Sequence, residues 1–300
     1  MVRVRVPATS ANMGAGFDTL GVALGLYNVL ELTEIDSGLQ VFSKRSGDYI
    51  PRDENNLVYR AAKTVFDRVG YNCSGLRIVQ ESDIPVTRGL GSSSACIIGG
   101  MLAANVISGR QLEYSEILDL ATELEGHPDN VTPALYGGFC AAMTENGKTV
   151  FKSIKIDSAI KFAIMVPDFF VPTRKSRGAL PSEVSHRDAA FNISRAVMFA
   201  LAMANGDISV LKSAVEDKLH QQYRKNYIDG MEEIFDMTYR SGSKATYLSG
   251  SGPTIVSVLD GGYNKFNADM HGFFMQNSHN WTCKILTIDN VGAVVRDFGK

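Results

Sequence analysis

A glycine- and serine-rich segment, residues 85–97, has the composition of a phosphate-binding loop. Gly89 and Gly91 permit the positive φ angles that let a backbone approach a ligand closely. An apolar run follows, and a helix beginning there would direct its N-terminal N–H groups at an anion. The residues expected to surround the phosphates are Pro85, Val86, Thr87, Arg88, Gly89, Leu90, Gly91, Ser92, Ser93, Ser94 and Ala95.

This loop is not a Walker A motif, because no lysine follows Gly91 to reach the phosphates. The three consecutive serines, 92–94, offer hydroxyl groups that can hydrogen-bond phosphate or bind Mg²⁺. Taken alone, the segment is also explained as a Gly/Ser turn that caps an ordinary helix. Other parts of the chain must decide between the two explanations.

Three further segments are rich in polar groups: residues 7–18 (PATSANMGAGFD), 125–133 (EGHPDNVTP) and 249–254 (SGSGPT). Together with residues 85–97, and in this order, they resemble the motifs of the GHMP small-molecule kinases. The family is named for galactokinase, homoserine kinase, mevalonate kinase and phosphomevalonate kinase. The resemblance covers nearly the whole chain, and the first two of these segments, with Leu-Pro at 180–181, are most similar to the homoserine kinase branch.

The resemblance implies that ATP is the phosphoryl donor and that Mg²⁺ accompanies it. It also implies that the metal is bound by the hydroxyl of Ser93 and the carboxylate of Glu125, which are the hard oxygen ligands that Mg²⁺ prefers. The spacing from Glu125 to Asn130 is shorter than in other homoserine kinases, so Asp119 and Glu123 remain alternatives for the carboxylate. A solvated carboxylate at a helix end also explains Glu125.

The resemblance further implies an amino-acid acceptor, L-homoserine, whose hydroxyl group attacks the γ-phosphate. Two arginine side chains would hold its α-carboxylate through their planar guanidinium groups. The remaining polar residues would contact its amine or hydroxyl group. The residues implied to bind the acceptor are Asn12, Asp18, Asn130, Thr173, Arg177 and Arg224. A turn residue at Asn12, a helix cap at Asp18 and a surface position at Arg224 are the structural alternatives.

The catalytic residues implied by the resemblance are Asp18, Ser93, Glu125 and Asn130. Asn130 replaces an aspartate that can act as a base in mevalonate and galactose kinases, and an asparagine side chain cannot take a proton. Proximity would then supply most of the rate, a contribution of up to about 7–11 kcal/mol. His127 titrates near neutrality, but we favour a structural role for it in the Gly-His-Pro turn.

Hydrophobic periodicity predicts the elements that position these residues. A buried helix over 94–108 follows the glycine loop directly, so its dipole can face the phosphates. Asn56, which the resemblance also places at the adenine site, precedes a helix of about a dozen residues and is expected to cap it with Asn55. The expected strands are 2–6, 29–35, 76–81, 161–166 and 254–259, and the other expected helices are 57–69, 114–125, 190–204, 207–219 and 229–241.

These elements and the family resemblance predict a two-domain α+β fold. Residues 1–150 would form an ATP-binding α/β domain with a mixed sheet, ending near a hairpin turn at 145–148. Residues 151–300 would form a ferredoxin-like α/β sandwich, because strands and helices alternate there as in a split β-α-β unit.

Composition agrees with a cytoplasmic enzyme. The 300 residues are 45% hydrophobic and carry a net charge of −2, which gives no electrostatic footprint for nucleic acid or an acidic membrane. Four scattered cysteines without a Cys-x-x-Cys motif argue against a zinc site and against disulfides. Neither a signal peptide nor an apolar run long enough to span a bilayer is recognisable.

Three questions stay open at this level. The acceptor of another GHMP kinase, such as mevalonate, is an alternative to homoserine. A catalytically silent nucleotide-binding regulator could share the same fold, since fold does not fix function. A homodimer is one alternative for the oligomeric state.

Overall fold

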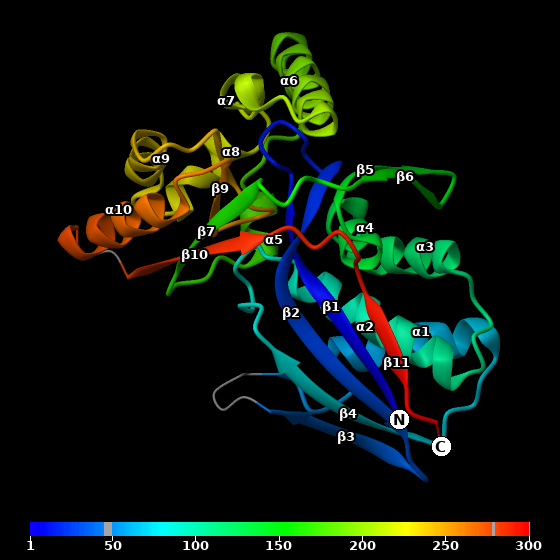
Figure 1. Ribbon diagram of the computed structural model, residues 1–300. Coiled ribbons are helices and arrows are strands. Elements are labelled where there is room, and N and C mark those ends of the chain that lie inside the picture. Colours follow the sequence, from blue (N-terminus) through cyan, green and yellow to red (C-terminus); the bar gives the residue numbers. More distant parts are fainter. Residues whose placement is uncertain (45–49, 278–279, 300) are drawn as a thin grey trace.

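The computed structural model describes residues 1–44, 50–277 and 280–299, which form two β-sheets flanked by helices (Figure 1). In the larger sheet the strand order is β11-β1-β2-β4-β3, and the hairpin of β5 and β6 joins it through β2. Among the strands that the structure describes, only β3 and β4 are parallel neighbours. The strands are β1 (Val2–Ala11), β2 (Leu20–Glu34), β3 (Gly38–Ser43), β4 (Gly75–Ser82), β5 (Phe139–Glu145), β6 (Lys148–Ile154) and β11 (Val294–Asp297).

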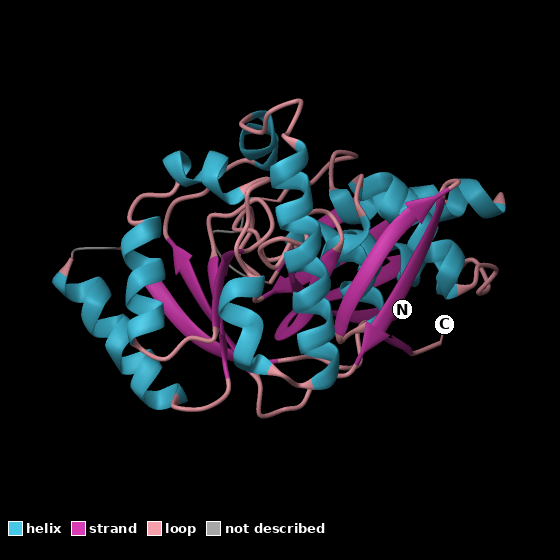
Figure 2. Cartoon of the chain, turned by 90° about the horizontal axis from the view of Figure 1, so that it is seen from above, coloured by secondary structure: helices cyan, strands magenta, loops and turns pink. Residues whose placement is uncertain are grey.

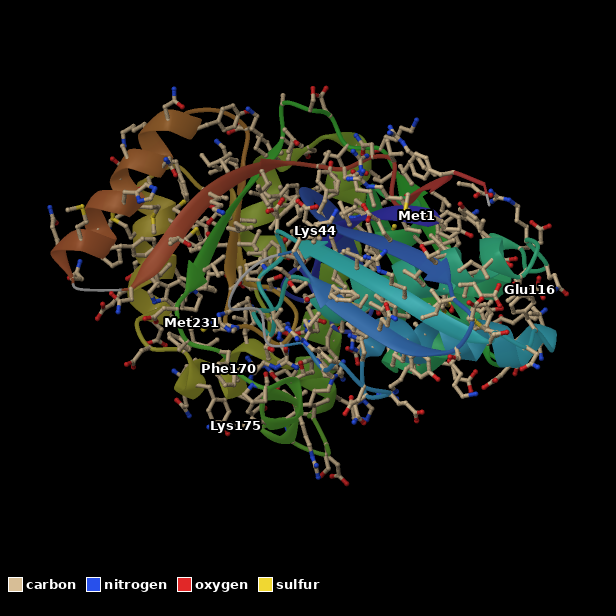
Figure 3. All side chains as sticks on the ribbon, turned by 90° about the horizontal axis from the view of Figure 1, so that it is seen from below. Met1, Lys44, Glu116, Phe170, Lys175 and Met231 are labelled. Carbon is tan, nitrogen blue, oxygen red and sulfur yellow. The ribbon has the colours of Figure 1, made fainter. Side chains whose placement is uncertain are left out.

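Helices cover one face of this sheet, while the other face is open to solvent and carries charged side chains. On the open face, Lys44 pairs with Glu31 at 3.1 Å and with Glu81 at 3.5 Å (Figure 3). The covering helices are α1 (Leu57–Val69), α2 (Ser92–Ile107), α3 (Tyr114–Glu125) and α4 (Pro128–Tyr136). The fold therefore places the predicted phosphate loop, which precedes α2, on the covered face.

The first three of these helices confirm the sequence-based predictions closely. The Asn56 side chain accepts hydrogen bonds from the backbone N–H groups of Val58 and Tyr59, so α1 begins as predicted. Gly70, in the left-handed conformation, ends it. Helix α2 is buried along most of its length, as expected for a helix that is apolar nearly all round.

Helix α4 was not predicted, because the Gly-His-Pro segment was interpreted as a turn. Pro128 stands at the first position of this helix, where its missing N–H is tolerated. Pro133 lies inside the helix and cannot donate to the carbonyl of Asp129. That carbonyl faces Gly21 of β2 so closely that a Cβ added at Gly21 would lie 1.9 Å from it. Tertiary packing therefore stabilises a helix that local propensity disfavours.

Strand β1 leads from the sheet into the space between the two sheets. Its valines are buried and its arginines exposed up to residue 6, which confirms the predicted alternation. The register with β2 shifts between Pro7 and Ala8, and from there every residue of β1 is buried. This bulge directs Thr9 and Ser10 inward, so residues 7–12 reach the region where both halves of the chain meet.

The smaller sheet has the order β10-β7-β9-β8 with every pair antiparallel, which is the ferredoxin-like arrangement. Its strands are β7 (Lys161–Pro167), β8 (Ala245–Leu248), β9 (Ile255–Leu259) and β10 (Trp281–Thr287). Helices α9 (Met231–Arg240) and α10 (Tyr263–Gln276) pack on one face of it (Figure 2). Strand β8 escaped prediction because it is only four residues long and fully buried, so it shows no alternation.

A helical segment connects β7 to α9, and one helix predicted there is wrong. Instead of a helix over 207–219, regular structure ends at Ala214. The carboxylate of Asp217 accepts hydrogen bonds from the backbone N–H groups of residues 219, 220 and 221, and so replaces helical hydrogen bonds with a turn. The segment contains α5 (Thr173–Gly178), α6 (His186–Asn205), η1 (Ile208–Val210), α7 (Leu211–Ala214), α8 (Gln221–Arg224) and η2 (Lys225–Tyr227).

The sheets do not follow the predicted division of the chain at residue 150. Strand β6 crosses that position, and β11 returns from the second half to pair with β1, which brings the two ends of the chain close together (Figure 1). The two-domain α+β class is observed, whereas the boundary itself stays a prediction. No helix within the described parts of the chain is long and apolar enough to cross a membrane.

Candidate active site

A cavity of about 290 Å³ lies where the glycine loop, the N-termini of α2 and α4, and the loop of residues 249–252 meet. It is lined by most of the residues predicted to bind nucleotide: Asn56, Val86, Thr87, Arg88, Gly89, Gly91, Ser92 and Ser93. Pro85, Leu90, Ser94 and Ala95 are not among the described residues that line it, and Leu90 and Ala95 belong to the hydrophobic core instead.

The glycine loop is held tightly against β1. Gly91 is the N-cap of α2 and has a φ of 66°, and a Cβ there would lie 1.9 Å from the hydroxyl oxygen of Thr9. The Thr9 N–H donates to the carbonyl of Leu90 at 3.1 Å. The first N–H groups of α2 therefore point into the cavity from a fixed position, where they can bind an anion.

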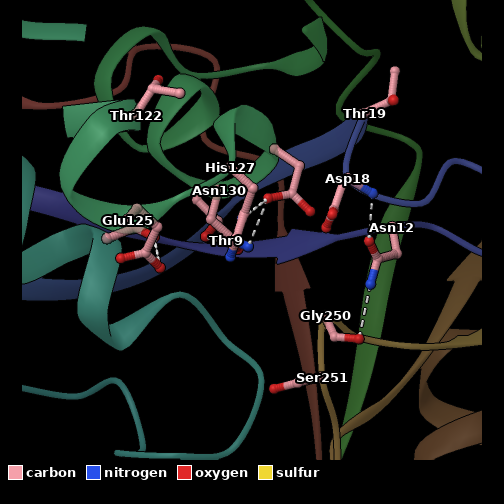
Figure 4. Close-up of polar contacts among 12 residues, drawn as sticks. Thr9, Asn12, Asp18, Thr19, Thr122, Glu125, His127, Asn130, Gly250 and Ser251 are labelled. Carbon is pink, nitrogen blue, oxygen red and sulfur yellow. Dashed lines mark hydrogen bonds and ion pairs between the residues drawn. The ribbon is translucent and has the colours of Figure 1, made fainter. Parts of the chain in front are cut away.

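Glu125, the last residue of α3, lies directly beside the start of α2 (Figure 4). Its Oε1 accepts hydrogen bonds from the hydroxyl groups of Ser93 at 2.6 Å and Ser94 at 3.0 Å. The two alternatives are placed elsewhere: Asp119 accepts from the backbone of β6, and Glu123 is exposed. Neither is among the described residues that line the cavity, which favours Glu125 as the carboxylate next to the phosphate loop.

Asn56 is buried at one end of the cavity, and both polar atoms of its side chain make hydrogen bonds within the protein. Its Oδ1 caps α1, while its Nδ2 donates to the carbonyl of Pro51 at 2.9 Å and to Oε1 of Gln80 at 3.1 Å. Ile50 and Leu57 add apolar surface beside it. This end of the cavity suits an aromatic base better than a charged group.

The loop after β1 is built around Asn12, whose φ is 67°. Its Nδ2 donates to the carbonyl of Gly250 at 2.8 Å, and its Oδ1 accepts from the backbone N–H of Asp18 at 2.9 Å (Figure 4). Asp18 in turn forms a bidentate pair with Arg177, at 2.7 and 3.1 Å. The hydrogen bonds to Asp18 raise the pKa of Arg177. Asp18 thus joins the cavity through Arg177, which lines it.

Arg224 is a buried cation, only 1% exposed, that lines the cavity from the second half of the chain. Its Nη1 donates to the carbonyl of Gly250 at 2.8 Å, and its Nε has no hydrogen-bond partner among the described residues. Burial and the nearby charge of Arg177 lower its pKa to about 10. Thr173 completes this side, with its hydroxyl 3.2 Å from that of Ser251. Two guanidinium groups that line the same cavity favour an anion there.

Asn130, in the first turn of α4, is fixed by two residues that sequence reasoning missed. Its Oδ1 accepts from the hydroxyl of Thr9 at 2.7 Å, and its Nδ2 lies 3.3 Å from Oδ1 of Asp129. Both Thr9 and Asp129 occur in the segments singled out from the sequence, and that was the available signal.

His127 also contacts Asp129, through Nδ1 and a carboxylate oxygen. Burial disfavours the imidazolium form, but the hydrogen bond and charge of Asp129, with the charge of Glu125, outweigh it and raise the pKa of His127. One potential ligand atom from each of Asp18, His127 and Asp129 lies within 4.8 Å of the other two. The carboxylates of Asp18 and Asp129 therefore form an acidic region of the site beside Arg177.

Comparison with known proteins agrees with this arrangement. Residues 56–138 match the family model of the GHMP kinases N-terminal domain, which includes the glycine loop, α2 and the Asp129-Asn130 pair. The fold and the site thus define a small-molecule kinase of the GHMP class.

Individual relatives show which branch of the GHMP kinases this chain resembles most. A homoserine kinase of Caldicellulosiruptor bescii is 46% identical over 297 residues, which is 98% of this chain and 97% of the relative. A homoserine kinase of Clostridium botulinum is 43% identical over 99% of both chains. The crystal structure of a homoserine kinase from Cytophaga hutchinsonii superposes with a TM-score of 0.87 at 25% identity, covering 98% of this chain and 97% of the other. The chain belongs to the homoserine kinase family.

Proposed function

We propose that this protein transfers the γ-phosphoryl group of ATP to the side-chain hydroxyl of L-homoserine, giving O-phospho-L-homoserine for threonine biosynthesis. One observation carries the proposal most: the guanidinium groups of Arg177 and Arg224 and the side chain of Asp129 line the same cavity as the phosphate loop, and Asp18 lies beside Asp129. A zwitterionic amino acid needs both a cationic and an anionic partner next to the transferred phosphate. Mevalonate carries a carboxylate but no amine, so it would leave the acidic region unused.

The nucleotide side of the site supports ATP. The phosphates would bind at the glycine loop and the N-terminus of α2, and the base would lie near Asn56 and the apolar surface of Ile50 and Leu57. The hydroxyl of Ser93 and the carboxylate of Glu125 would hold Mg²⁺, since they are adjacent hard oxygens, 2.6 Å apart, beside the loop. Bound Mg²⁺ neutralises phosphate charge that develops during transfer.

The acceptor side supports homoserine in one orientation. Its carboxylate would lie at Arg177 and Arg224, its amine at Asp18 and Asp129, and its hydroxyl at the Asn130 amide. The hydroxyl oxygen forms a bond to the γ-phosphorus as the bond to ADP breaks, and its proton passes late to an oxygen of the transferred phosphoryl group, because a loose transition state needs little activation of the nucleophile. The amide of Asn130 cannot take this proton, so positioning is its role.

The test is ADP release measured with homoserine, serine, mevalonate and galactose, and with the methyl ester of homoserine. We expect homoserine to give the highest kcat/KM. The kcat/KM for the ester should be lower than that for homoserine by roughly 10- to 150-fold, since charge-assisted hydrogen bonds contribute about 1.5–3 kcal/mol. Equal use of homoserine and its ester would mean that the carboxylate is not recognised, and higher activity with mevalonate or galactose would assign another acceptor.

A further inference from the structure

His220 is a fully buried residue one helical turn before Arg224, and it lies outside the set of residues that line the cavity. Its Nε2 is 2.8 Å from the carbonyl oxygen of Gly14, in the loop after β1. Its Nδ1 is 3.1 Å from Nη1 of Arg224. The ring therefore lies between the loop that carries Asn12 and the buried arginine.

These two contacts determine the tautomer of the ring. A carbonyl oxygen only accepts, so Nε2 must carry the proton that is donated to Gly14. A guanidinium group only donates, so Nδ1 must present its lone pair to Arg224. His220 is therefore neutral, with its proton on Nε2. Burial also lowers the pKa of His220, which favours the same neutral form.

The turn around His220 does not need the imidazole ring for its own stability. The carboxylate of Asp217 already accepts from the backbone N–H groups of residues 219, 220 and 221. Asn192 closes the same turn by donating to Asp217 at 2.8 Å and by accepting from the N–H of Lys218. The ring makes its hydrogen bonds with Gly14 and Arg224, and its Nε2 also lies 3.7 Å from Oδ2 of Asp217.

The contact with His220 determines which part of Arg224 stays free. Nη1 is occupied by the Nδ1 lone pair of His220 and by the carbonyl of Gly250, whereas Nε has no partner among the described residues. The aromatic ring of Phe17 lies 5.6 Å from the guanidinium carbon and 5.4 Å from the His220 ring. The guanidinium plane is therefore fixed on several sides, while Arg224 still lines the cavity.

We propose that His220 is a positioning residue: by accepting a hydrogen bond at Nδ1, it orients Arg224 so that the guanidinium group recognises the carboxylate of the acceptor. This inference rests on the proposed function, because it assigns that carboxylate to Arg224. The hydrogen-bond acceptor at Nδ1 orients Arg224, and the N–H donor at Nε2 holds the ring in place.

Two substitutions separate the roles of the two ring nitrogens. In His220→Asn, the amide oxygen can take the place of Nδ1 and still accept from Arg224. In His220→Gln, the amide nitrogen can take the place of Nε2 and still donate to Gly14, but no acceptor faces Arg224. We expect His220→Gln to raise KM for homoserine about tenfold or more, as loss of one charge-assisted contact does, with KM for ATP unchanged. His220→Asn should raise it clearly less.

The preference for homoserine over its methyl ester is the second measurement. His220→Gln should reduce this preference, because a misoriented Arg224 no longer distinguishes a charged carboxylate, and a purely structural role would leave it unchanged. Thr238→Val is the matched control: it removes a buried hydroxyl of α9 that donates to the carbonyl of Phe235 and lies 2.7 Å from the hydroxyl of Thr246 in β8, away from the cavity. It should lower Tm without changing the preference.

Three results would overturn the inference: equal KM values for the two His220 variants, an unchanged ester preference in His220→Gln, or ¹⁵N NMR showing the proton of the wild-type ring on Nδ1. The NMR measurement needs no substrate. A wild-type enzyme that uses the ester as well as homoserine would instead contradict the proposed function, so the two failures are distinguishable.

Discussion

At the scale of single residues, the site is defined by two arginines whose charges are compensated in different ways. Arg177 is paired with Asp18 through two hydrogen bonds, whereas Arg224 has no carboxylate partner among the described residues and hydrogen-bonds to the carbonyl oxygen of Gly250 and to His220. Burying a cation in this way costs free energy unless a ligand or a network compensates it. An acceptor carboxylate would supply that compensation.

Glu125 gives the most direct test at this scale. In Glu125→Gln the amide oxygen can still accept from Ser93 and Ser94, so the fold should persist, but the negative charge beside the phosphate loop is lost. We expect kcat to fall about 10²-fold or more, the usual effect of removing one preorganised electrostatic group. Steady-state ADP release checks this.

The controls for Glu125 are the two acidic residues that the sequence left as alternatives. Glu123→Gln changes an exposed carboxylate and should leave kcat within about twofold of wild type. Asp119→Asn alters the acceptor for the N–H of Thr149 and should affect Tm rather than kcat. A large loss of kcat in either control with none in Glu125→Gln would transfer the metal role to that residue.

At the scale of elements, the site depends on helix N-termini that meet the end of one strand. The first turns of α2 and α4 both face the cavity, and Thr9 of β1 contacts the glycine loop before α2 at Leu90 and the first turn of α4 at Asn130. A shift of the glycine loop would therefore also move the amide of Asn130. Thr9 therefore connects the nucleotide region of the site with the acceptor region.

Gly91→Ala tests this link. The new Cβ would lie 1.9 Å from the Thr9 hydroxyl oxygen, so either Thr9 or the loop must move. Because a displacement of about 1 Å in a catalytic arrangement can cost 10²-fold in rate, we expect kcat/KM for ATP to fall by about that factor. Unfolding measured in parallel should show that the variant still folds.

Gly109→Ala is the matched control. Gly109 also has a positive φ, 95°, but a Cβ there would meet nothing within 4 Å. It should lower the free energy of unfolding by about 1–2 kcal/mol through backbone strain alone, with unchanged kcat/KM. If Gly91→Ala behaved no differently from Gly109→Ala, the close packing of the loop against Thr9 would have no role in catalysis.

At the scale of the whole molecule, the site exists only where the two halves of the chain are joined. The hydroxyl of Ser249 donates to the carbonyl of Gly89 at 2.5 Å and lies 2.7 Å from that of Ser10. The N–H of Gly250 donates to the carbonyl of Ala11. The loop of residues 249–252 thus holds the glycine loop and the end of β1 together.

Ser249→Ala should weaken this junction. We expect it to lower the free energy of unfolding by about 1–3 kcal/mol, because buried groups lose their hydrogen-bond partner, and to raise KM for ATP. Thr254→Val, five residues later, removes a buried hydroxyl that has no partner among the described residues, so it should be neutral or stabilising. Equal destabilisation by both substitutions, measured by urea unfolding, would contradict the role given to Ser249.

Several features of this protein were determined by the sequence itself, because they depend on short stretches of chain. Asn56 and Gly70 mark the ends of α1, and the alternation of valine and arginine marks the first half of β1. Most of the residues predicted to bind nucleotide and acceptor lie around one cavity, since they belong to recognisable motifs.

Only the tertiary structure decided how these motifs act together. Thr9 and Asn130 are 121 residues apart, and His220 and Gly14 are 206 apart, so no local pattern could reveal their hydrogen bonds. The same holds where long-range contacts override local preference, as in α4, whose internal proline is tolerated by packing against β2. A local pattern encodes propensity and chemistry, whereas the orientation of a buried side chain is fixed by whichever distant groups the fold brings to it.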